Sequence, residues 1–496
     1  QSFTSSAMRS FLHSTTTVCF LRTRVIDFCQ ICPLSTRVET NLTPDLLTKT
    51  QYKQRYPIHY AVWNGCISDA SLYLAGVAEV NTRDNRSQFP LMMAAIEGRA
   101  DMIKLLIDKG AVVDAACPSG DTALHAAIIG GHESAILALI RGGAGIENVN
   151  PRSEFFPLMI ALQSPKPENV LQILIDHGAH LDVRDAPNGR AALHYAALNG
   201  DKAALTLLIR RGAMLDIKDK LGDTPLHIAA FHGRTECIEA LLGKDKLLVN
   251  AVNCEGSTPL LMAACEGQTE SVLTLIKHGP ALEGSNRTLP LYAAAVSGHT
   301  ECIEALLGND RGLVNSSNEG GSTMLGLAAQ EGHSESVSML IKNGANPNLQ
   351  DKNGRTALHF AAINGHRATL ALLLAHGARL DAADRTGFTP LHLAALQGRS
   401  NCIGALLAKD RRLINAVTRD GWTALHAAAG QGHTESVSLL IRSGADRELK
   451  DIDGLTAVHL AAIGGHRAAL VLLKSQGPVA PAQGPGRRAP RPRRAP

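Results

Sequence analysis

An aliphatic residue, most often leucine, returns along the chain at nearly constant spacing, and in almost every case it follows a proline or an alanine. The steps between successive positions are 31 to 35 residues long. Such a period predicts an array of similar units, each too thin to bury its own apolar side, rather than one thick core. The recurring positions are Ile58, Leu91, Leu124, Leu158, Leu193, Leu226, Leu260, Leu291, Leu325, Leu358, Leu391, Leu425 and Val458.

Each unit has the pattern of two short helices and a hairpin-like loop, as residues 223–242 illustrate. Thr224 followed by Pro225 is typical of a helix start, since threonine caps a free N–H and proline fits the first turn. Ala229 and Ala230 keep the first helix slim, and Gly233 ends it. The second helix is predicted to have one apolar stripe, which here contains Ile238, Leu241 and Leu242.

The T-P-L-H motif at 224–227, the paired alanines and the G-H turn at 298–299 resemble the ankyrin repeat. The resemblance covers residues 52–477 in about 13 repeats. It implies an all-α solenoid of stacked helix-turn-helix units with β-hairpin-like loops. In this family the hairpin tips and first helices line a concave groove that binds other proteins. Residues 1–51 are then expected to form a disordered or leader segment, and residues 478–496 a disordered tail rich in proline and arginine.

A longer period of about 100 residues overlies the first, because the second helices fall into three types that recur in order. The first type is found at 204–213, 368–378 and 468–477, the second at 236–245, 301–310 and 401–410, and the third at 270–279, 335–344 and 435–444. Two repeats depart from the pattern. Pro165 and Pro167 replace the turn after Leu158, and the segment before Leu291 is two residues short, so we expect changes of curvature at both places.

Histidines and cysteines are the candidate metal ligands, but their positions are those of the repeat. Fourteen of the 20 histidines lie either in the T-P-L-H position or directly after the turn glycine, where an imidazole can bridge neighbouring loops. Cys29 and Cys32 form a single C-x-x-C pair without a second pair, so it predicts no zinc site. With no nucleotide-binding, hydrolase or kinase motif in the sequence, we expect neither a cofactor nor an enzyme.

The candidate binding residues come from the row just before each T-P-L motif, which projects toward the groove in ankyrin repeats. Most members of this row are polar, as an exposed row would be, but Phe388, Trp422 and Leu455 are apolar on consecutive repeats. A second row after the paired alanines adds Ile363, Leu396 and Ile463. Neighbouring exposed apolar groups favour a protein-binding site. The alternative is that these side chains only cover the neighbouring hairpins.

Charge separates the ends of the chain from its body. Residues 51–476 carry 39 basic and 42 acidic side chains, so the body does not favour nucleic acid, whereas five arginines lie in the last 20 residues. The tail therefore offers a hypothesis of nuclear import or nucleic-acid binding, and residues 1–26, with three arginines and no acid, weakly resemble a mitochondrial presequence. Ten scattered cysteines and no apolar run long enough to span a membrane favour a cytoplasmic location.

Two functional hypotheses follow. The first is a scaffold or adaptor that binds partner proteins through the groove. The second is the recognition portion of a larger enzyme, channel or secreted effector whose active domain lies outside this chain.

Overall fold

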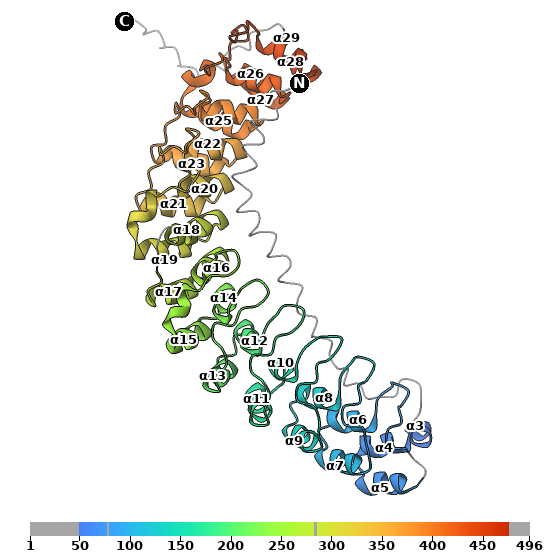
Figure 1. Ribbon diagram of the computed structural model, residues 1–496. Helices are drawn as coiled ribbons and strands as arrows, with labels where there is room; N and C mark the ends of the chain where they lie inside the picture. Colours follow the sequence, from blue (N-terminus) through green and yellow to red (C-terminus); the bar gives the residue numbers. More distant parts are fainter. Residues whose placement is uncertain (1–48, 77–78, 282–284, 476–496) are drawn as a thin grey trace, which may run out of the picture. The chain divides into compact units, whose positions relative to one another are not determined.

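The computed structural model describes residues 49–76, 79–281 and 285–475, in which short helices alternate with loops (Figure 1). Among them there is no strand, only an isolated bridge between Ser317 and Thr323. Helix α3 (Lys49–Arg55) precedes the first repeat. The first helices of the repeats are α4 (Pro57–Asn64), α6 (Pro90–Ile96), α8 (Ala123–Ile129), α10 (Pro157–Ala161), α12 (Ala192–Asn199), α14 (Pro225–Phe231), α16 (Pro259–Cys265), α18 (Ser285–Ser297), α20 (Met324–Glu331), α22 (Ala357–Asn364), α24 (Pro390–Leu396), α26 (Ala424–Gly430) and α28 (Ala457–Ile463).

Each first helix is followed by a second helix. The second helices are α5 (Ile67–Ala75), α7 (Ala100–Asp108), α9 (Glu133–Arg141), α11 (Pro167–Asp176), α13 (Lys202–Arg210), α15 (Thr235–Lys244), α17 (Thr269–Lys277), α19 (Thr300–Asn309), α21 (Ser334–Lys342), α23 (Arg367–Ala375), α25 (Ser400–Lys409), α27 (Thr434–Arg442) and α29 (Arg467–Lys474). Three short 3-10 helices follow the second helices of one type, namely η1 (Lys246–Asn250), η2 (Arg311–Asn315) and η3 (Arg411–Asn415).

The chain divides into two compact parts. The N-terminal part consists of Gln1–Ala294 with Glu304–Asn309, and the C-terminal part of Ala295–Ile303 with Asp310–Pro496. In the N-terminal part the first helices α4 to α16 pack on one another in sequence order, and the second helices α5 to α17 do the same. In the C-terminal part the same holds for α20 to α28 and for α21 to α29.

Apart from α18, the first helices begin where the T-P-L-H motif predicts, and two kinds of contact fix their starts. The Thr258 hydroxyl accepts the N–H of Leu261 at 3.3 Å, and Pro259 occupies the first turn. At α14 the Thr224 N–H donates to Nδ1 of His227 at 3.2 Å, so the imidazole takes the place of the acid in a capping box. The histidine of the motif is therefore part of the helix start.

The core is a succession of thin layers between neighbouring repeats. Leu226 and the paired alanines Ala229 and Ala230 are fully buried, as are Ile238 and Leu241 on the following helix. Small side chains on the first helix let the next layer approach closely, so each layer buries apolar surface mainly against its two neighbours.

Both irregular repeats differ from their neighbours in helix length. Helix α10, before the Pro165–Pro167 turn, has only 5 residues. Helix α18 has 13 residues and contains Pro290 in its interior. The residues just before Pro290 are therefore helical, whereas in the other repeats with a proline at this position the helix begins at the proline. The shortened segment thus changes the local structure, while the predicted change of curvature stays a prediction.

Candidate protein-binding surface

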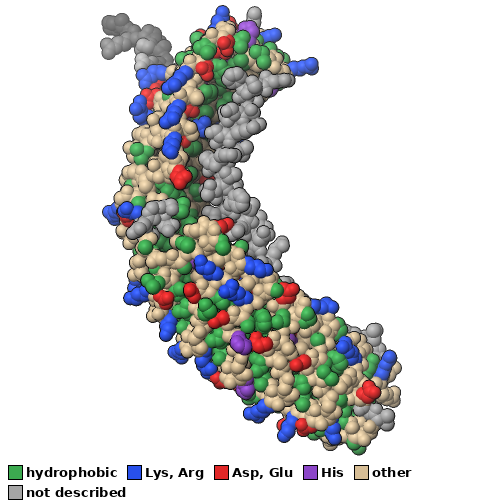
Figure 2. Space-filling view, viewed as in Figure 1, with side chains coloured by type: hydrophobic (Ala, Val, Ile, Leu, Met, Phe, Trp, Pro, Cys, Tyr) green, Lys and Arg blue, Asp and Glu red, His purple; other side chains and the backbone are tan. Residues whose placement is uncertain are grey.

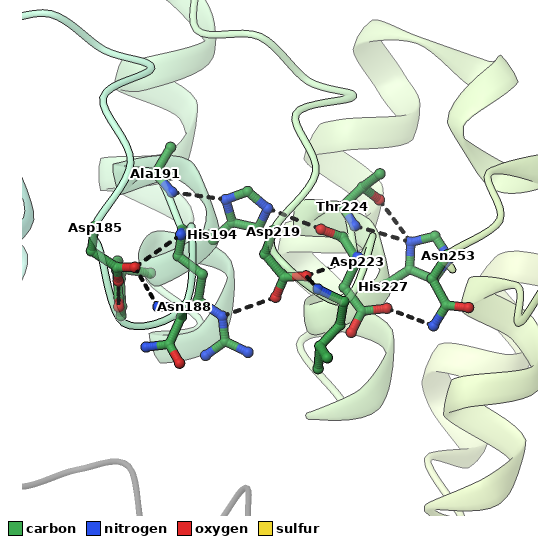
Figure 3. A network of polar contacts seen from close by, with 12 residues as sticks. Asp185, Asn188, Ala191, His194, Asp219, Asp223, Thr224, His227 and Asn253 are labelled. Carbon is green, nitrogen blue, oxygen red and sulfur yellow. Dashed lines mark hydrogen bonds and ion pairs between the residues drawn. The ribbon is translucent and has the colours of Figure 1, made fainter. Parts of the chain in front are cut away.

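The histidines of the T-P-L-H motif join each repeat to the next one. Nδ1 of His194 accepts the N–H of Ala191 at 3.1 Å, and its Nε2–H donates to the carbonyl oxygen of Asp223 at 3.1 Å (Figure 3). His227 lies in the same way between Thr224 and the carbonyl of Ser257, at 3.0 Å from the latter. The expected bridging of neighbouring loops by imidazoles is confirmed. Equivalent bonds are made by His59, His125, His359, His392 and His426.

Burial keeps these histidines neutral. Desolvation lowers the pKa of His194, His227 and His359 from 6.5 to about 4, although the carbonyl that each bonds opposes the shift. Because Nδ1 accepts a backbone N–H, the ring must carry its proton on Nε2. A ring with both nitrogens engaged in this way has no lone pair left for a metal ion or for acid–base catalysis.

The residue after the turn glycine makes a second set of bonds, directed toward the preceding repeat. In the C-terminal part, His366 Nε2 donates to the carbonyl of Gln330 at 2.9 Å, and His433 Nε2 to that of Leu396 at 3.0 Å. Arginine or glutamine can replace histidine here, since only a side-chain donor of suitable length is needed. The replacements are Arg99, Arg234, Gln268 and Arg399.

Most of the described hairpins are built around one polar side chain. Oδ1 of Asp384 accepts the N–H groups of Thr386 and Phe388, both at 2.9 Å, which folds the tip into a tight turn. Asp351 and Asp451 do the same for Arg355 and Leu455 at 2.8 Å. These acceptors orient the row of residues that precedes the T-P-L motif.

The expectation that this row is exposed throughout is wrong. Arg190, Asp223 and Ser257 are buried. Their side chains or backbones contribute to pairs between adjacent hairpins: Arg190 Nε lies 3.2 Å from Oδ2 of Asp219, and Asn253 donates to Asp223 at 2.8 Å (Figure 3). Arg190 and Asp223 are therefore buried because they pair with Asp219 and Asn253, the turn-forming residues of the next hairpins.

The apolar members of the row lie on three consecutive hairpins of the C-terminal part. Phe388, Trp422 and Leu455 are all half-buried. Their backbone carbonyls accept hydrogen bonds from His359, His392 and His426, at 3.1, 3.0 and 3.2 Å, so neighbouring repeats hold the three positions in register. The Phe388 ring also packs edge-on against His392, with centroids 5.9 Å apart.

The second candidate row separates into three environments. Ile363 is only 5% exposed, so the expectation of a groove-facing side chain is wrong at this position, where the next repeat covers α22. Leu396 is half-buried. Ile463 is 73% exposed, because it lies on the last described repeat and no further described layer covers it.

Two further apolar residues are exposed on the hairpins of the candidate row. Val417 is 56% exposed and Ile452 is 71% exposed. Both belong to the hairpins of Trp422 and Leu455, and these two hairpins are joined by the Ile452 N–H, which donates to the Asp420 carbonyl at 3.1 Å. The signal was present in the sequence, since Lys352, Arg385 and Arg419 are the basic counterparts of Ile452 in the three preceding hairpins.

Across the visible face of the protein, basic and acidic side chains are interspersed rather than separated into large fields (Figure 2). Within residues 49–76, 79–281 and 285–475, no group of three or more His, Cys, Asp or Glu side chains is arranged to hold a metal ion. In the same ranges no helix has the length and apolarity to cross a bilayer. Cys29, Cys32, the arginine tail at 478–496 and most of the predicted leader lie outside the described residues.

Burial also explains the thiols that recur at one helical position. Cys237 and Cys402 lie fully inside the second-helix layer, and desolvation raises the pKa of both to about 11. They act as small apolar side chains, as their equivalent positions predict.

Comparison with known proteins places this architecture in a family. The family model for ankyrin repeats in groups of three copies matches overlapping segments from residue 58 to residue 480. The chain therefore belongs to the ankyrin repeat family, and its fold is an all-α ankyrin solenoid.

Individual relatives share about a quarter to a third of the aligned residues. The ankyrin repeat and KH domain-containing protein mask-1 of Caenorhabditis elegans is 29% identical over 52% of this chain and 10% of its own length. The B-cell lymphoma 3 protein homolog of Mus musculus is 29% identical over 46% of this chain and 52% of its own length. The crystal structure of the ankyrin repeat domain of Bcl-3, described as a unique member of the IkappaB protein family, is 27% identical, with a TM-score of 0.39, over 42% of this chain and 93% of that one. The chain thus spans about half or less of the length of these two curated relatives.

Proposed function

We propose that this chain is a non-enzymatic scaffold or adaptor, and that the hairpins of residues 384–455 provide its main contact with partner proteins. The observation that supports the proposal is the change of character along one row. Where the hairpins of Arg190 and Asp223 pair through polar side chains, Phe388, Trp422 and Leu455 are apolar and half-buried, and Val417 and Ile452 are exposed on the hairpins of Trp422 and Leu455. We call these five apolar residues the hairpin patch. Adjacent exposed apolar groups are typical of interaction sites.

The environment of the hairpin patch suits an anchor better than a flexible contact. The backbone of each row residue is fixed by a histidine of the preceding repeat, and Phe388 is further held by its packing on His392. Side chains that are already oriented lose less conformational entropy when a partner binds, so a modest area can give useful affinity. The same packing would also occur if the row only covered its own hairpins, and binding measurements separate the two interpretations.

A triple variant, Phe388→Ala, Trp422→Ala and Leu455→Ala, tests the proposal. We expect partners purified with the full chain to be lost or to bind at least tenfold more weakly, while circular dichroism stays helical. The matched control is Val112→Ala, which truncates an exposed residue of the N-terminal part and leaves the hairpin patch intact. Undiminished binding by the triple variant would remove the hairpin patch from consideration as the contact surface.

We also propose a cytoplasmic location, with nuclear import through the basic tail as the alternative. The seven cysteines in the described ranges are all free thiols, which is compatible with a reducing compartment. Fluorescence microscopy of the tagged full chain, with and without residues 478–496, distinguishes the two locations.

A second candidate function is that the array is the recognition portion of a larger enzyme, channel or secreted effector. The support is that the matched segment makes up only 10% of one relative and 52% of another. The complete reading frame of the gene decides this alternative, because it either encodes a further domain or does not.

A further inference from the structure

The last described repeat has counterparts of the residues with which an inner repeat contacts the repeat that follows it. The comparison is with residues 351–375, here called the 351 repeat, which is covered by residues 384–409, the 384 repeat. The hydrogen bonds between these two repeats include three: the Asn353 carbonyl accepts the Arg385 N–H at 2.8 Å, His359 Nε2–H donates to the Phe388 carbonyl at 3.1 Å, and the Ile363 carbonyl accepts the Arg399 Nε–H at 3.0 Å.

Two glycines of the 351 repeat make room for this neighbour. A Cβ atom added to Gly354 would lie 2.9 Å from the Arg385 nitrogen, and one added to Gly365 would lie 3.0 Å from Cδ of Arg399. Both contacts are closer than side-chain carbons normally come. Because the two glycines have no side chain, the next hairpin and the next turn can approach closely at these positions.

The same set recurs 100 residues later in residues 451–474, the 451 repeat, which carries Asp453, His459, Ile463, Gly454 and Gly465. Here the features have no neighbour among the described residues. His459 bonds only Thr456, through Nδ1, and a Cβ atom at either glycine would meet nothing within 4 Å. His459 is exposed, whereas His359 is fully buried.

The uncovered side is also apolar where a terminal repeat normally becomes polar. Ile463 is 73% exposed, against 5% for Ile363. Ala462 is exposed and Leu470 half-buried, whereas their counterparts Ala362 and Leu370 are fully buried. We call Asp453, His459, Ala462, Ile463 and Leu470, with the two glycines, the end face.

We propose that the end face binds an ankyrin-type repeat that resembles the 384 repeat. The occupant follows from the first-type second helix of the 451 repeat, because both other repeats of that type, at 204–213 and 368–378, are followed by a second-type repeat. It must offer a hairpin N–H and a hairpin carbonyl in register, and an arginine or a similar donor at its turn. The end face shares no residue with the hairpin patch, although Asp453 and Gly454 lie between Ile452 and Leu455 in the same hairpin, and this inference does not rest on the proposed function.

A second copy of this chain does not meet these requirements with its first repeat. Helix α3 occupies the place of a hairpin before α4, and Cys66 stands at the turn position that Arg399 fills in the 384 repeat. A thiol is only a weak hydrogen-bond donor. The occupant is therefore a repeat whose exposed side has a hairpin and a strong turn donor, as the 384 repeat has, and not the first repeat of a second copy.

The test uses a fluorescently labelled probe made of residues 379–475, whose first repeat is the 384 repeat, with Ile463→Asp added so that the probe cannot bind itself. After circular dichroism shows that the probe is helical, it is titrated with the full chain and followed by fluorescence anisotropy. We expect saturable binding that weakens at least tenfold with Ile463→Asp in the full chain, and likewise with Arg399→Ala in the probe.

The control is Val471→Asp in the full chain. Val471 is 69% exposed and lies in the same repeat, but on a side that stays exposed even in the covered 351 repeat, as Ala371 shows. This variant should bind the probe normally. Absence of binding by a helical probe, or equal loss with Val471→Asp, would overturn the proposal.

A second experiment, which does not require the probe to fold alone, uses a variant in which the probe is joined to the chain. In the tethered variant, the chain from residue 1 to Gln476 is fused directly to a second copy of residues 377–475. The fusion places a 384 repeat next to the end face. We expect amide hydrogen exchange in residues 457–466 to slow at least tenfold relative to the natural chain. Unchanged exchange would show that the end face does not accept such a repeat.

Discussion

His359 donates its Nε2–H to the backbone carbonyl of Phe388 at 3.1 Å, so a buried imidazole of one repeat fixes an apolar residue of the hairpin patch in the next. On its other side the same ring accepts the N–H of Thr356 at 3.1 Å. The helix start, the stacking of repeats and the position of a candidate contact residue thus depend on one side chain.

Removing this ring should therefore cost stability. His359→Ala leaves a buried N–H and a buried carbonyl without their partner, and we expect the free energy of unfolding to fall by about 1–3 kcal/mol. Urea unfolding followed by circular dichroism measures the change. His376→Ala is the control, because His376 is exposed and bonds only the Leu372 carbonyl of its own helix. Equal effects of the two substitutions would contradict the assigned role.

Stability should depend on pH between about 6.5 and 4. His194, His227 and His359 have a pKa of about 4 in the folded chain, against 6.5 for the free side chain. Within this window the unfolded chain binds more protons, so the free energy of unfolding falls as the pH is lowered, by at most about 3 kcal/mol for each histidine. Above about pH 6.5 these groups contribute no slope.

Urea midpoints at pH 7.5, 6.5 and 5.5 check this dependence before most carboxylates titrate. His227→Gln should reduce the slope, since glutamine does not take up a proton in this range. A constant midpoint from pH 7.5 to 5.5 would contradict the prediction.

The buried ion pair between Arg190 and Asp219 provides a further test. Their side chains are 5% and 1% exposed. Arg190→Met should lower the free energy of unfolding by about 3–5 kcal/mol, because it leaves the Asp219 carboxylate buried without its counterion. Adding Asp219→Asn should restore at least half of the loss, since asparagine keeps the turn-forming oxygen and removes the charge. Asn253 and Asn318 already fill the equivalent hairpin positions. A double variant no more stable than Arg190→Met would refute this account.

Two glycines with nearly the same φ allow the effect of backbone strain to be separated from that of crowding. Gly387 has φ of 87° and Gly377 has φ of 85°, so alanine at either position costs about 1 kcal/mol of conformational strain. A Cβ atom at Gly387 would also lie 2.6 Å from the Arg419 nitrogen, whereas nothing lies within 4 Å at Gly377. Gly387→Ala should therefore be the more destabilising by more than about 1 kcal/mol in urea unfolding. Equal losses would mean that the hairpins are not closely packed.

The sequence predicted the helices and the bridging histidines well because both depend on residues that every repeat must contain. Thr224, Pro225 and His227 act within one helix start, and the next hairpin always offers a backbone carbonyl, whatever its side chains are. The turn donors were only partly found, because Arg99, Arg234 and Gln268 make the bond expected of histidine with a different side chain.

Exposure along the candidate row was harder to predict because it depends on pairs of positions. Arg190 is buried because Asp219 faces it from the next hairpin, and Asp223 because Asn253 does. A search for complementary side chains 29 or 30 residues apart would have found both pairs. Ile363 and Ile463 show the same limit, since identical side chains in nearly identical segments differ only in whether a further repeat covers them.

The histidine bonds join residues that are only 23 to 37 positions apart, forward to the following repeat or back to the preceding one. Bonds of such short range need no long loop to close before they form. Reassembly after denaturation can therefore start at any adjacent pair of repeats within either compact part and spread in both directions, and a protease cut in one hairpin would leave the repeats on either side still able to hold their own neighbours.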